Sequence, residues 1–528
     1  MARRHLEVFS ALLLALIVAG GAGAAPVRGG QMIYARAADS LFLDPVLNDA
    51  NVDIWVLTNL YDTLLEPSAD GRSVTPGLAS GYVLSPDGLT MVLTLRPGIK
   101  FADGSPVLAG DVKFSLDRAR DPKAGQWNFL LAAIDAIDVS APDTVAIRLK
   151  HPDPTLPAAL ATFNTGILPE QAFMAAPGAT LEEKATSFAQ HPLGAGPFRL
   201  TEWHRNLAME LERNPYYWAK GEDGKALPYL DVLRFEIIPD DATRILKLQG
   251  GEVDGAEFIP LARAAELQRD PDLQMQLLPA SEVTYLTFMT RPVTKDGKPN
   301  PLADPRVRQA LNYALDKDAF IHVVNFGNGT PMASFMPSTT PLAVAGAPLY
   351  AYDPARAKAL LAEAGFDQGI DLSVMLLAGS AKEIAIASVA QQMWGEIGVR
   401  VTLEQLDNAT ATARYRGGDF AARVSTWTND IADPSEITSY FAYSPNIECQ
   451  HSGFKDPVID ADFEASQQET DPEKRAALFR DIQVRFAAAA PIAFLFESPY
   501  SVALRKPVHG FQQISLGNNI FAATYLGN

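Results

Sequence analysis

The sequence predicts an α/β protein with more than one domain, and three observations support this class. The chain has 528 residues, several times the ~150 residues of an average domain, so more than one hydrophobic core is expected. Hydrophobic residues make up 48% of it and charged residues 20%, an ordinary globular composition. From residue 371 onward, extended and helical patterns alternate, which is typical of helices packed on a sheet.

Strand patterns dominate the first third of the chain. Every second residue is apolar in the segment 89–96, and the segment 144–149 repeats this alternation. Turn residues at short spacing surround both segments. We therefore expect a sheet-rich subdomain between about residues 60 and 190.

Helix starts are marked twice by the same dipeptide. Asp304-Pro305 and Asp353-Pro354 each place a capping side chain before a proline suited to the first helical position, and apolar residues follow at helical spacing. Gly365 is positioned to end the second helix. The expected elements that follow are a strand over 371–377, a helix over 383–397, and strands over 399–406 and 420–427.

Residues 1–24 have the pattern of a cleavable signal peptide. Arg3 and Arg4 precede an apolar stretch over 9–19 and then small residues, with cleavage expected after Ala24 or Ala25. The stretch is shorter than the ~20 residues that cross a bilayer. No cysteine follows it to accept a lipid, so we expect a soluble periplasmic protein, exported by the general or the twin-arginine route.

Charge and cysteine content exclude further classes. The 44 basic and 62 acidic residues give a net charge of −18, which disfavours binding to nucleic acid. Cys449 is the single cysteine, so an internal disulfide is excluded.

Motifs for catalysis are missing from the sequence. It contains no H-E-x-x-H, G-x-S-x-G or C-x-x-C pattern, and Gly194-Ala-Gly196 lacks the third glycine of a dinucleotide loop. We expect no enzyme activity, no cofactor and no metal site.

The segment 420–436 is the most informative part of the chain. On a strand, Arg423, Ser425 and Trp427 share one face, an unusual mixture for a buried strand. Ligands of open α/β sheets bind beyond the carboxyl ends of strands, where Asp430 follows. Asp430 therefore either pairs with a ligand cation or, with Asp433-Pro434, caps a turn or helix; the spacing leaves both open.

Several ordered motifs carry a resemblance that spans nearly the whole mature chain. They are NLYDTLLEP (59–67), LSPDGLTMVLTLRPGIKFADGSPVLAGDVKFSLDRA (84–119), LGAGPFRLTEW (193–203), ERNPYYW (212–218), DPRVRQALNYALDKDAF (304–320) and DPARAKALLAEAGF (353–366). In these motifs the chain resembles the family 5 extracellular solute-binding proteins, the receptors of ABC importers for peptides and related solutes.

The resemblance implies a two-lobed periplasmic binding protein fold, with a two-strand hinge and an extra subdomain on the first lobe. Lobe I is expected to comprise 25–58, 194–282 and 498–528, the extra subdomain 59–193, and lobe II 283–497. The crossings between the lobes are expected at Val283–Phe288 and around Ile492–Val502.

The resemblance also suggests site residues. Peptide-binding members carry a W-x-x-D pattern whose aspartate receives the ligand's α-ammonium, and Trp427-Thr-Asn-Asp430 matches it. Dipeptide binders carry an arginine at the start of the helix that corresponds to 383–397, which this chain lacks, so a dipeptide ligand is in doubt. The expected ligand-binding residues are Asp430, Trp427, Arg423, Ser425, Asn429 and Lys382, with Lys382 or Arg423 as the candidate cation for a ligand carboxylate.

The expected function is that of a monomeric periplasmic receptor. It captures a small peptide or another amine-bearing solute between the lobes and delivers it to an ABC permease and its ATPase in the inner membrane. One alternative is the same fold binding an opine, a nickel chelate, haem or a sugar. An alternative of another class is a secreted hydrolase with paired carboxylates.

Overall fold

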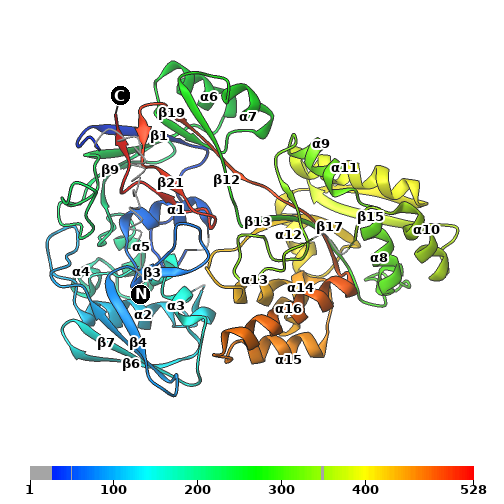
Figure 1. Cartoon of the computed structure of the whole chain (residues 1–528), viewed down its shortest axis with the longest axis horizontal. Coiled ribbons are helices and arrows are strands. Elements are labelled where there is room, and N and C mark those ends of the chain that lie inside the picture. Colours follow the sequence, from blue (N-terminus) through cyan, green and yellow to red (C-terminus); the bar gives the residue numbers. More distant parts are fainter. Residues whose placement is uncertain (1–25, 49, 126, 347–349, 528) are drawn as a thin grey trace, which may run out of the picture.

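The computed structural model describes residues 26–48, 50–125, 127–346 and 350–527 and forms two lobes (Figure 1). The signal peptide predicted over residues 1–24 lies outside the described residues. Within the described ranges, every helix is too short or too polar to traverse a lipid bilayer.

Lobe I is built on a seven-stranded mixed sheet. In spatial order its strands are β12 (Leu273–Leu278), β19 (Tyr500–Arg505), β11 (Gly255–Glu257), β1 (Gln31–Arg36), β10 (Val232–Ile237), β9 (Ala208–Arg213) and β8 (Phe198–His204). β1 runs parallel to both β10 and β11, whereas β19 pairs antiparallel with β11 and β12. The lobe's helices are α1 (Asn51–Leu60), α6 (Asp241–Gly250) and α7 (Leu261–Leu267).

The extra subdomain carries a separate four-stranded antiparallel sheet. Its strands, in spatial order, are β4 (Ala79–Leu84), β5 (Thr90–Leu95), β7 (Thr144–Leu149) and β6 (Ile134–Ala141). Its helices are α2 (Ala109–Ala119), α3 (Leu156–Ala159), α4 (Glu170–Ala175) and α5 (Leu181–Phe188). A small hairpin of β2 (Leu65–Pro67) and β3 (Val74–Pro76) precedes the sheet.

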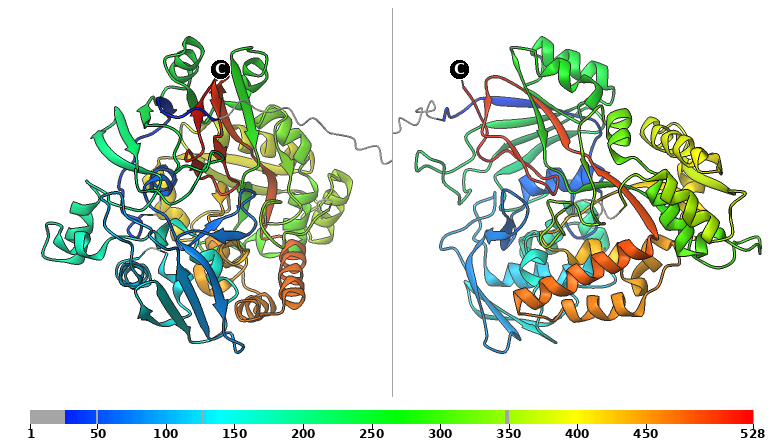
Figure 2. Two further views of the ribbon diagram at one scale, coloured as in Figure 1. Left: turned by 60° about the vertical axis from the view of Figure 1, so that its left-hand side comes forward. Right: turned by 45° about the vertical axis from the view of Figure 1, so that its right-hand side comes forward.

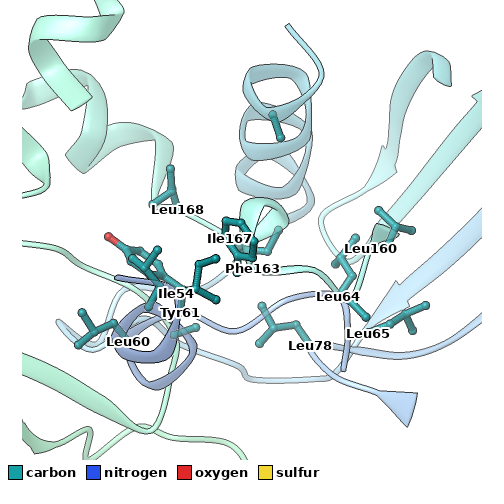
Figure 3. Close-up of a cluster of buried hydrophobic side chains, with 14 of the residues drawn as sticks. Ile54, Leu60, Tyr61, Leu64, Leu65, Leu78, Leu160, Phe163, Ile167 and Leu168 are labelled. Carbon is teal, nitrogen blue, oxygen red and sulfur yellow. The ribbon is translucent and has the colours of Figure 1, made fainter. Parts of the chain in front are cut away.

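The subdomain and lobe I share one hydrophobic core. Buried side chains from both belong to a single cluster, which extends from Met32 and Tyr34 of β1 to Val145 and Ile147 of β7. Figure 3 shows part of this cluster, with Ile54 and Leu60 of α1 and with Phe163 and Leu168 of the subdomain. Because no separate core divides them, we expect the two parts to move together.

Lobe II contains a six-stranded sheet covered by helices. The strand order is β14 (Thr330–Pro331), β18 (Ile492–Glu497), β13 (Glu282–Phe288), β17 (Ala422–Thr428), β15 (Ile370–Leu377) and β16 (Val399–Leu406). β15 is parallel to β16 and β17. The helices are α8 (Pro305–Tyr313), α9 (Lys317–Val324), α10 (Pro354–Glu363), α11 (Ala381–Glu396), α12 (Asn408–Arg416), α13 (Ser435–Phe441), α14 (Ser444–His451), α15 (Pro457–Ser466) and α16 (Pro472–Ala489).

The chain passes between the two sheets at two short connections. Residues 279–281 join β12 to β13, and Ser498 with Pro499 joins β18 to β19. Both connections line a cavity of about 390 Å³. The segment Val283–Phe288, predicted to cross between the lobes, instead pairs along its length inside the lobe II sheet, so the crossing lies just before it.

Helix α16 brings lobe II against the subdomain. Figure 2 shows this long helix and α15 on the side of lobe II nearest the subdomain. Arg475 of α16 donates a hydrogen bond to the hydroxyl of Thr155, 3.2 Å away in the subdomain.

Most expected elements are confirmed at close to the predicted bounds. Asp304 and Asp353 cap α8 and α10 through their side chains, and Gly365 follows α10 with φ of 86°. The predicted strand over 420–427 begins two residues later, as β17.

Cys449 is fully buried in lobe II. It lies in a left-handed turn of four consecutive residues that ends α14, with φ between 48° and 59° over 448–451. Hydrogen bonds from the hydroxyls of Tyr285 and Tyr415 to the side chain of Gln450 hold this turn. Burial raises the pKa of the Cys449 thiol, which therefore stays protonated.

Candidate ligand-binding site

The carboxyl ends of the parallel strands β15 and β17 lie at the edge of lobe II that contacts lobe I. Ser281, in the first connection, donates a hydrogen bond to the carbonyl of Asn429, 2.8 Å away. Ile431 is buried as part of the lobe I core cluster. The loop that follows β17 therefore reaches the other lobe, and Asp430 lies in this loop.

Asp430 presents a desolvated carboxylate without a partner. The residue is half-buried, and within the described ranges no hydrogen bond or ion pair reaches its side chain, whereas its backbone N–H is held by Glu436. Burial raises the pKa of Asp430 to about 7. A carboxylate that is removed from water without a counterion is the arrangement expected where a ligand supplies the cation.

Glu436 adds a second acidic group beside Asp430. Its Oε2 accepts the N–H of Asp430 at 2.8 Å, and it stands in the first turn of α13. Its pKa is raised well above the usual range by burial and by the charge of Asp430. Ionisation of one of these two acids therefore disfavours ionisation of the other.

Aromatic rings of lobe II surround the acids. The ring of Trp427 lies 4.4 Å from that of Tyr440, and its buried Nε1 has no hydrogen-bond partner among the described atoms. Burial and the charges of Glu436 and Asp430 raise the pKa of Tyr440 to about 12, so its hydroxyl stays protonated. Such rings favour packing with a ligand that also carries a cation.

Lobe I contributes three aromatic side chains that pack on one another. Trp55 lies 5.1 Å from Phe258 and 6.4 Å from Tyr500, measured between ring centroids. Burial, together with the charges of Glu282 and Asp430, raises the pKa of Tyr500.

Phe258 is held in an unfavourable conformation. Its side chain is 39% exposed and its φ is 51°, in the left-handed region that costs a non-glycine residue on the order of 1 kcal/mol or more. The buried Arg244 fixes this geometry by donating a hydrogen bond to the Phe258 carbonyl, 3.1 Å away. An exposed ring in a strained position at the end of β11 is a candidate ligand contact.

Lys382 and Asn429 lie at the same edge but are already engaged. The ammonium of Lys382 pairs with Glu282 at 2.7 Å. Asn429 is fully buried, and its amide donates to the Ile431 carbonyl at 2.7 Å, leaving its Oδ1 without a partner among the described atoms.

Arg423 and Ser425 lie further from Asp430. The guanidinium of Arg423 stacks over the ring of Tyr415 at 4.1 Å, and Arg423 precedes Trp427 by four residues, about 13 Å along an extended strand. Ser425 is buried and faces Tyr285 in the core of lobe II. The structure therefore groups Asp430, Trp427, Asn429 and Lys382 at one edge and places Arg423 and Ser425 along the strand away from it.

The capping interpretation applies to Asp433 instead. Its carboxylate accepts the N–H of Ser435 at 2.9 Å and forms a bidentate pair with Arg475 at 2.8 and 2.9 Å. Asp433 therefore anchors the loop to α16, whereas the side chain of Asp430 remains available to a ligand.

Several residues of this edge carry no signal in the sequence. Trp55, Phe258 and Tyr500 come from lobe I segments far from Asp430 in the chain, and only tertiary structure brings them near it. Glu436 had a weak signal, since it follows Asp433-Pro434 at the start of a helix, where acidic residues are common.

Comparison with known proteins agrees with this architecture. Residues 73–448 match the family described as bacterial extracellular solute-binding proteins, family 5. The chain is 29% identical to the glutathione-binding protein GsiB of Pectobacterium atrosepticum, over 94% of this chain and 95% of that protein.

Solved structures share the fold over almost the full length. HbpA2 from Haemophilus parasuis superposes with a TM-score of 0.80 at 28% identity, covering 94% of this chain and 100% of the other. The periplasmic binding protein DppA from Helicobacter pylori, in complex with the peptide STSA, gives 0.79 at 25% identity, covering 95% and 99%. On the family match and these two-lobed neighbours, the chain belongs to the family 5 extracellular solute-binding proteins of ABC importers.

Proposed function

We propose that this solute-binding protein captures a small peptide or another amine-bearing solute between its lobes, with Asp430 pairing with the solute's ammonium group. The observation that carries the proposal is the half-buried carboxylate of Asp430, which is unpaired among the described residues and whose charge acts on Tyr440 of lobe II and Tyr500 of lobe I. Trp427 supplies ring area, and Asn429 and Lys382 stand at the same edge.

Relatives support a peptide solute. One is named for glutathione, and a structural neighbour was solved with the peptide STSA. Other relatives are a haem-binding protein from Haemophilus influenzae and a binding protein in complex with agropinic acid, which define the non-peptide alternative. An unpaired acid favours a solute that carries an amine.

The remaining steps of the transport cycle are those expected for the family. Periplasmic binding proteins close around their ligands by a hinge motion, and closure requires that the solute bind the closed state more tightly than the open state. The closed monomer would then dock on a membrane permease whose ATPase supplies the energy, in the periplasm, after removal of residues 1–24.

Native mass spectrometry of the freshly purified protein tests this function. We expect a carried solute with an amine group, and the same compound at a hundred times its Kd should add about 2.7 kcal/mol to the free energy of unfolding in a thermal-shift assay. Solution scattering should show a more compact particle with the solute than without it. An identical shape at saturation, or a carried solute that lacks any cationic group, would reject the proposal.

A turnover assay distinguishes the receptor from the hydrolase alternative. Stoichiometric binding without product supports the receptor, whereas conversion of a chromogenic peptide or glycoside in proportion to protein concentration supports the hydrolase. The double variant Asp430→Asn/Glu436→Gln should leave any contaminating activity unchanged.

We expect the affinity for an amine-bearing ligand to fall as the pH falls through 7. The ligand ammonium pairs with the ionised form of Asp430, whose pKa in the free protein is about 7, so affinity should approach a tenfold loss per pH unit below that value. The stability of the free protein depends on pH in the opposite direction. Folding raises the pKa of the Asp430 carboxyl, so its ionisation destabilises the native state above pH 7. This cost disappears as the pH falls.

Calorimetric titrations between pH 5.5 and 8.5 check this expectation. Asp430→Asn should flatten the pH profile of affinity, since the main titrating group is removed. An equally steep profile in the variant would assign the pH dependence to another group.

A further inference from the structure

A cavity of about 420 Å³ lies between the extra subdomain and lobe II. Phe129 and Asp153 line it from the subdomain, and Ser435, Glu436 and Glu464 line it from lobe II. Because its two walls belong to different lobes, its shape depends on how the lobes meet.

The lining of this cavity is acidic. Asp153, Glu436 and Glu464 contribute three carboxyl groups, and His151 is the one basic side chain among the described lining residues. Two cations nearby are engaged: Arg475 by Asp433, and Lys150 by the carbonyl of Ala132, 2.8 Å away. Among the described residues, none of these three carboxyl groups forms an ion pair, so each can pair with a cationic guest.

Two buried polar groups on the cavity wall lack partners. Glu436 is 1% exposed, and its Oε1 has no hydrogen bond among the described atoms. Ser435 is 4% exposed, and its hydroxyl is also unpaired within the described part of the chain. An unsatisfied buried polar group is costly to a native structure, so such groups at a cavity indicate that a bound molecule completes them.

The cavity and the Asp430 site have a residue in common. Glu436 lines the cavity and also accepts the N–H of Asp430 at 2.8 Å. The ring of Tyr440 lies 4.4 Å from Trp427 on one side and 6.3 Å from Phe129 of the cavity wall on the other. Glu436 and the ring of Tyr440 therefore connect the cavity wall with the Asp430 site.

We propose that this acidic cavity binds a second cationic group of the solute, so that the protein selects molecules with two separated cations. The inference rests on the proposed function, since the first cation is the one held by Asp430. Two sources have this chemistry: a peptide with a lysine or arginine side chain, and a linear diamine.

Electrostatics supports the assignment. Burial and the charge of Asp433 raise the pKa of Asp153 to about 6, and the pKa of Glu436 is raised as well. A guest ammonium would favour the ionised form of both acids. Its attraction is strong because the groups are shielded from water.

The experiment compares matched probes by calorimetry at pH 8. Ala-Lys is measured against Ala-norleucine, which has the same chain without the charge, and cadaverine against pentylamine. We expect the dicationic member of at least one pair to bind tenfold or more tightly. Which pair shows the preference identifies the source of the second cation.

Variants assign that preference to the cavity. Glu436→Gln and Asp153→Asn keep an acceptor oxygen for their backbone donors and should reduce the preference to less than threefold. Glu473→Gln, an exposed residue at the start of α16, should retain it.

Three results overturn the inference: equal affinity within both pairs, a preference that persists in both cavity variants, or no binding of any of the four probes. Failure of the proposed function looks different. In that case Asp430→Asn leaves the affinity for monocationic probes unchanged, or native mass spectrometry reports a solute without an amine.

Discussion

Asp430→Asn is expected to weaken the binding of an amine-bearing ligand by at least about tenfold. Loss of one member of a desolvated charge pair costs about 2–5 kcal/mol, because the other charge is left buried and unpaired. Asp430 fits this case, since burial raises its pKa and no cation of the described protein compensates it. Isothermal titration at pH 8, where the carboxyl is ionised, measures the effect.

Asp371→Asn is the matched control for this prediction. Asp371 is an exposed acid of lobe II that pairs with Arg400 at 2.6 Å, away from the site. The control should bind as the native protein does. Equal affinity of Asp430→Asn and the native protein would remove Asp430 from the ligand site.

Arg475→Met is expected to lower the free energy of unfolding by about 3–5 kcal/mol. Arg475 and Asp433 are 9% and 5% exposed, and they form a bidentate pair at 2.8 and 2.9 Å. Breaking a buried pair leaves one charge uncompensated, which is more costly than the loss of an exposed pair. Urea denaturation followed by circular dichroism gives the change in midpoint.

The double variant Asp433→Asn/Arg475→Met tests the cause. A neutral amide at 433 needs no counterion and still offers an oxygen to the N–H of Ser435, so most of the lost stability should return. If the double variant is as unstable as Arg475→Met alone, the loss comes from packing of the arginine stem rather than from the stranded charge.

Local patterns predicted the elements of the fold well. Alternation and capping residues determine a strand or a helix within a few neighbours, so β7 and the starts of α8 and α10 agree with the sequence prediction. The position of the first crossing was wrong by a few residues. Val283–Phe288 has the pattern of an extended segment whether it joins lobes or pairs within a sheet, and only the pairing of β13 with β17 and β18 decides this.

The site was predictable in part for the same reason. Asp430 follows a strand, so its place at a carboxyl end could be inferred from the sequence. The partners of Lys382 and Arg423 could not, because Glu282 and the ring of Tyr415 reach them through tertiary contacts. Nor could local patterns indicate that Glu436 would stand beside Asp430, since that depends on how the loop after β17 turns back.

The burial of Cys449 has a practical consequence for following the motion of the lobes. The one native thiol is protonated and inaccessible, so maleimide dyes should not react with it in the folded protein. One cysteine introduced on the surface of each lobe would then carry the donor or the acceptor fluorophore, and Cys449 would not have to be replaced. Energy transfer between them would report solute capture in real time, one molecule at a time.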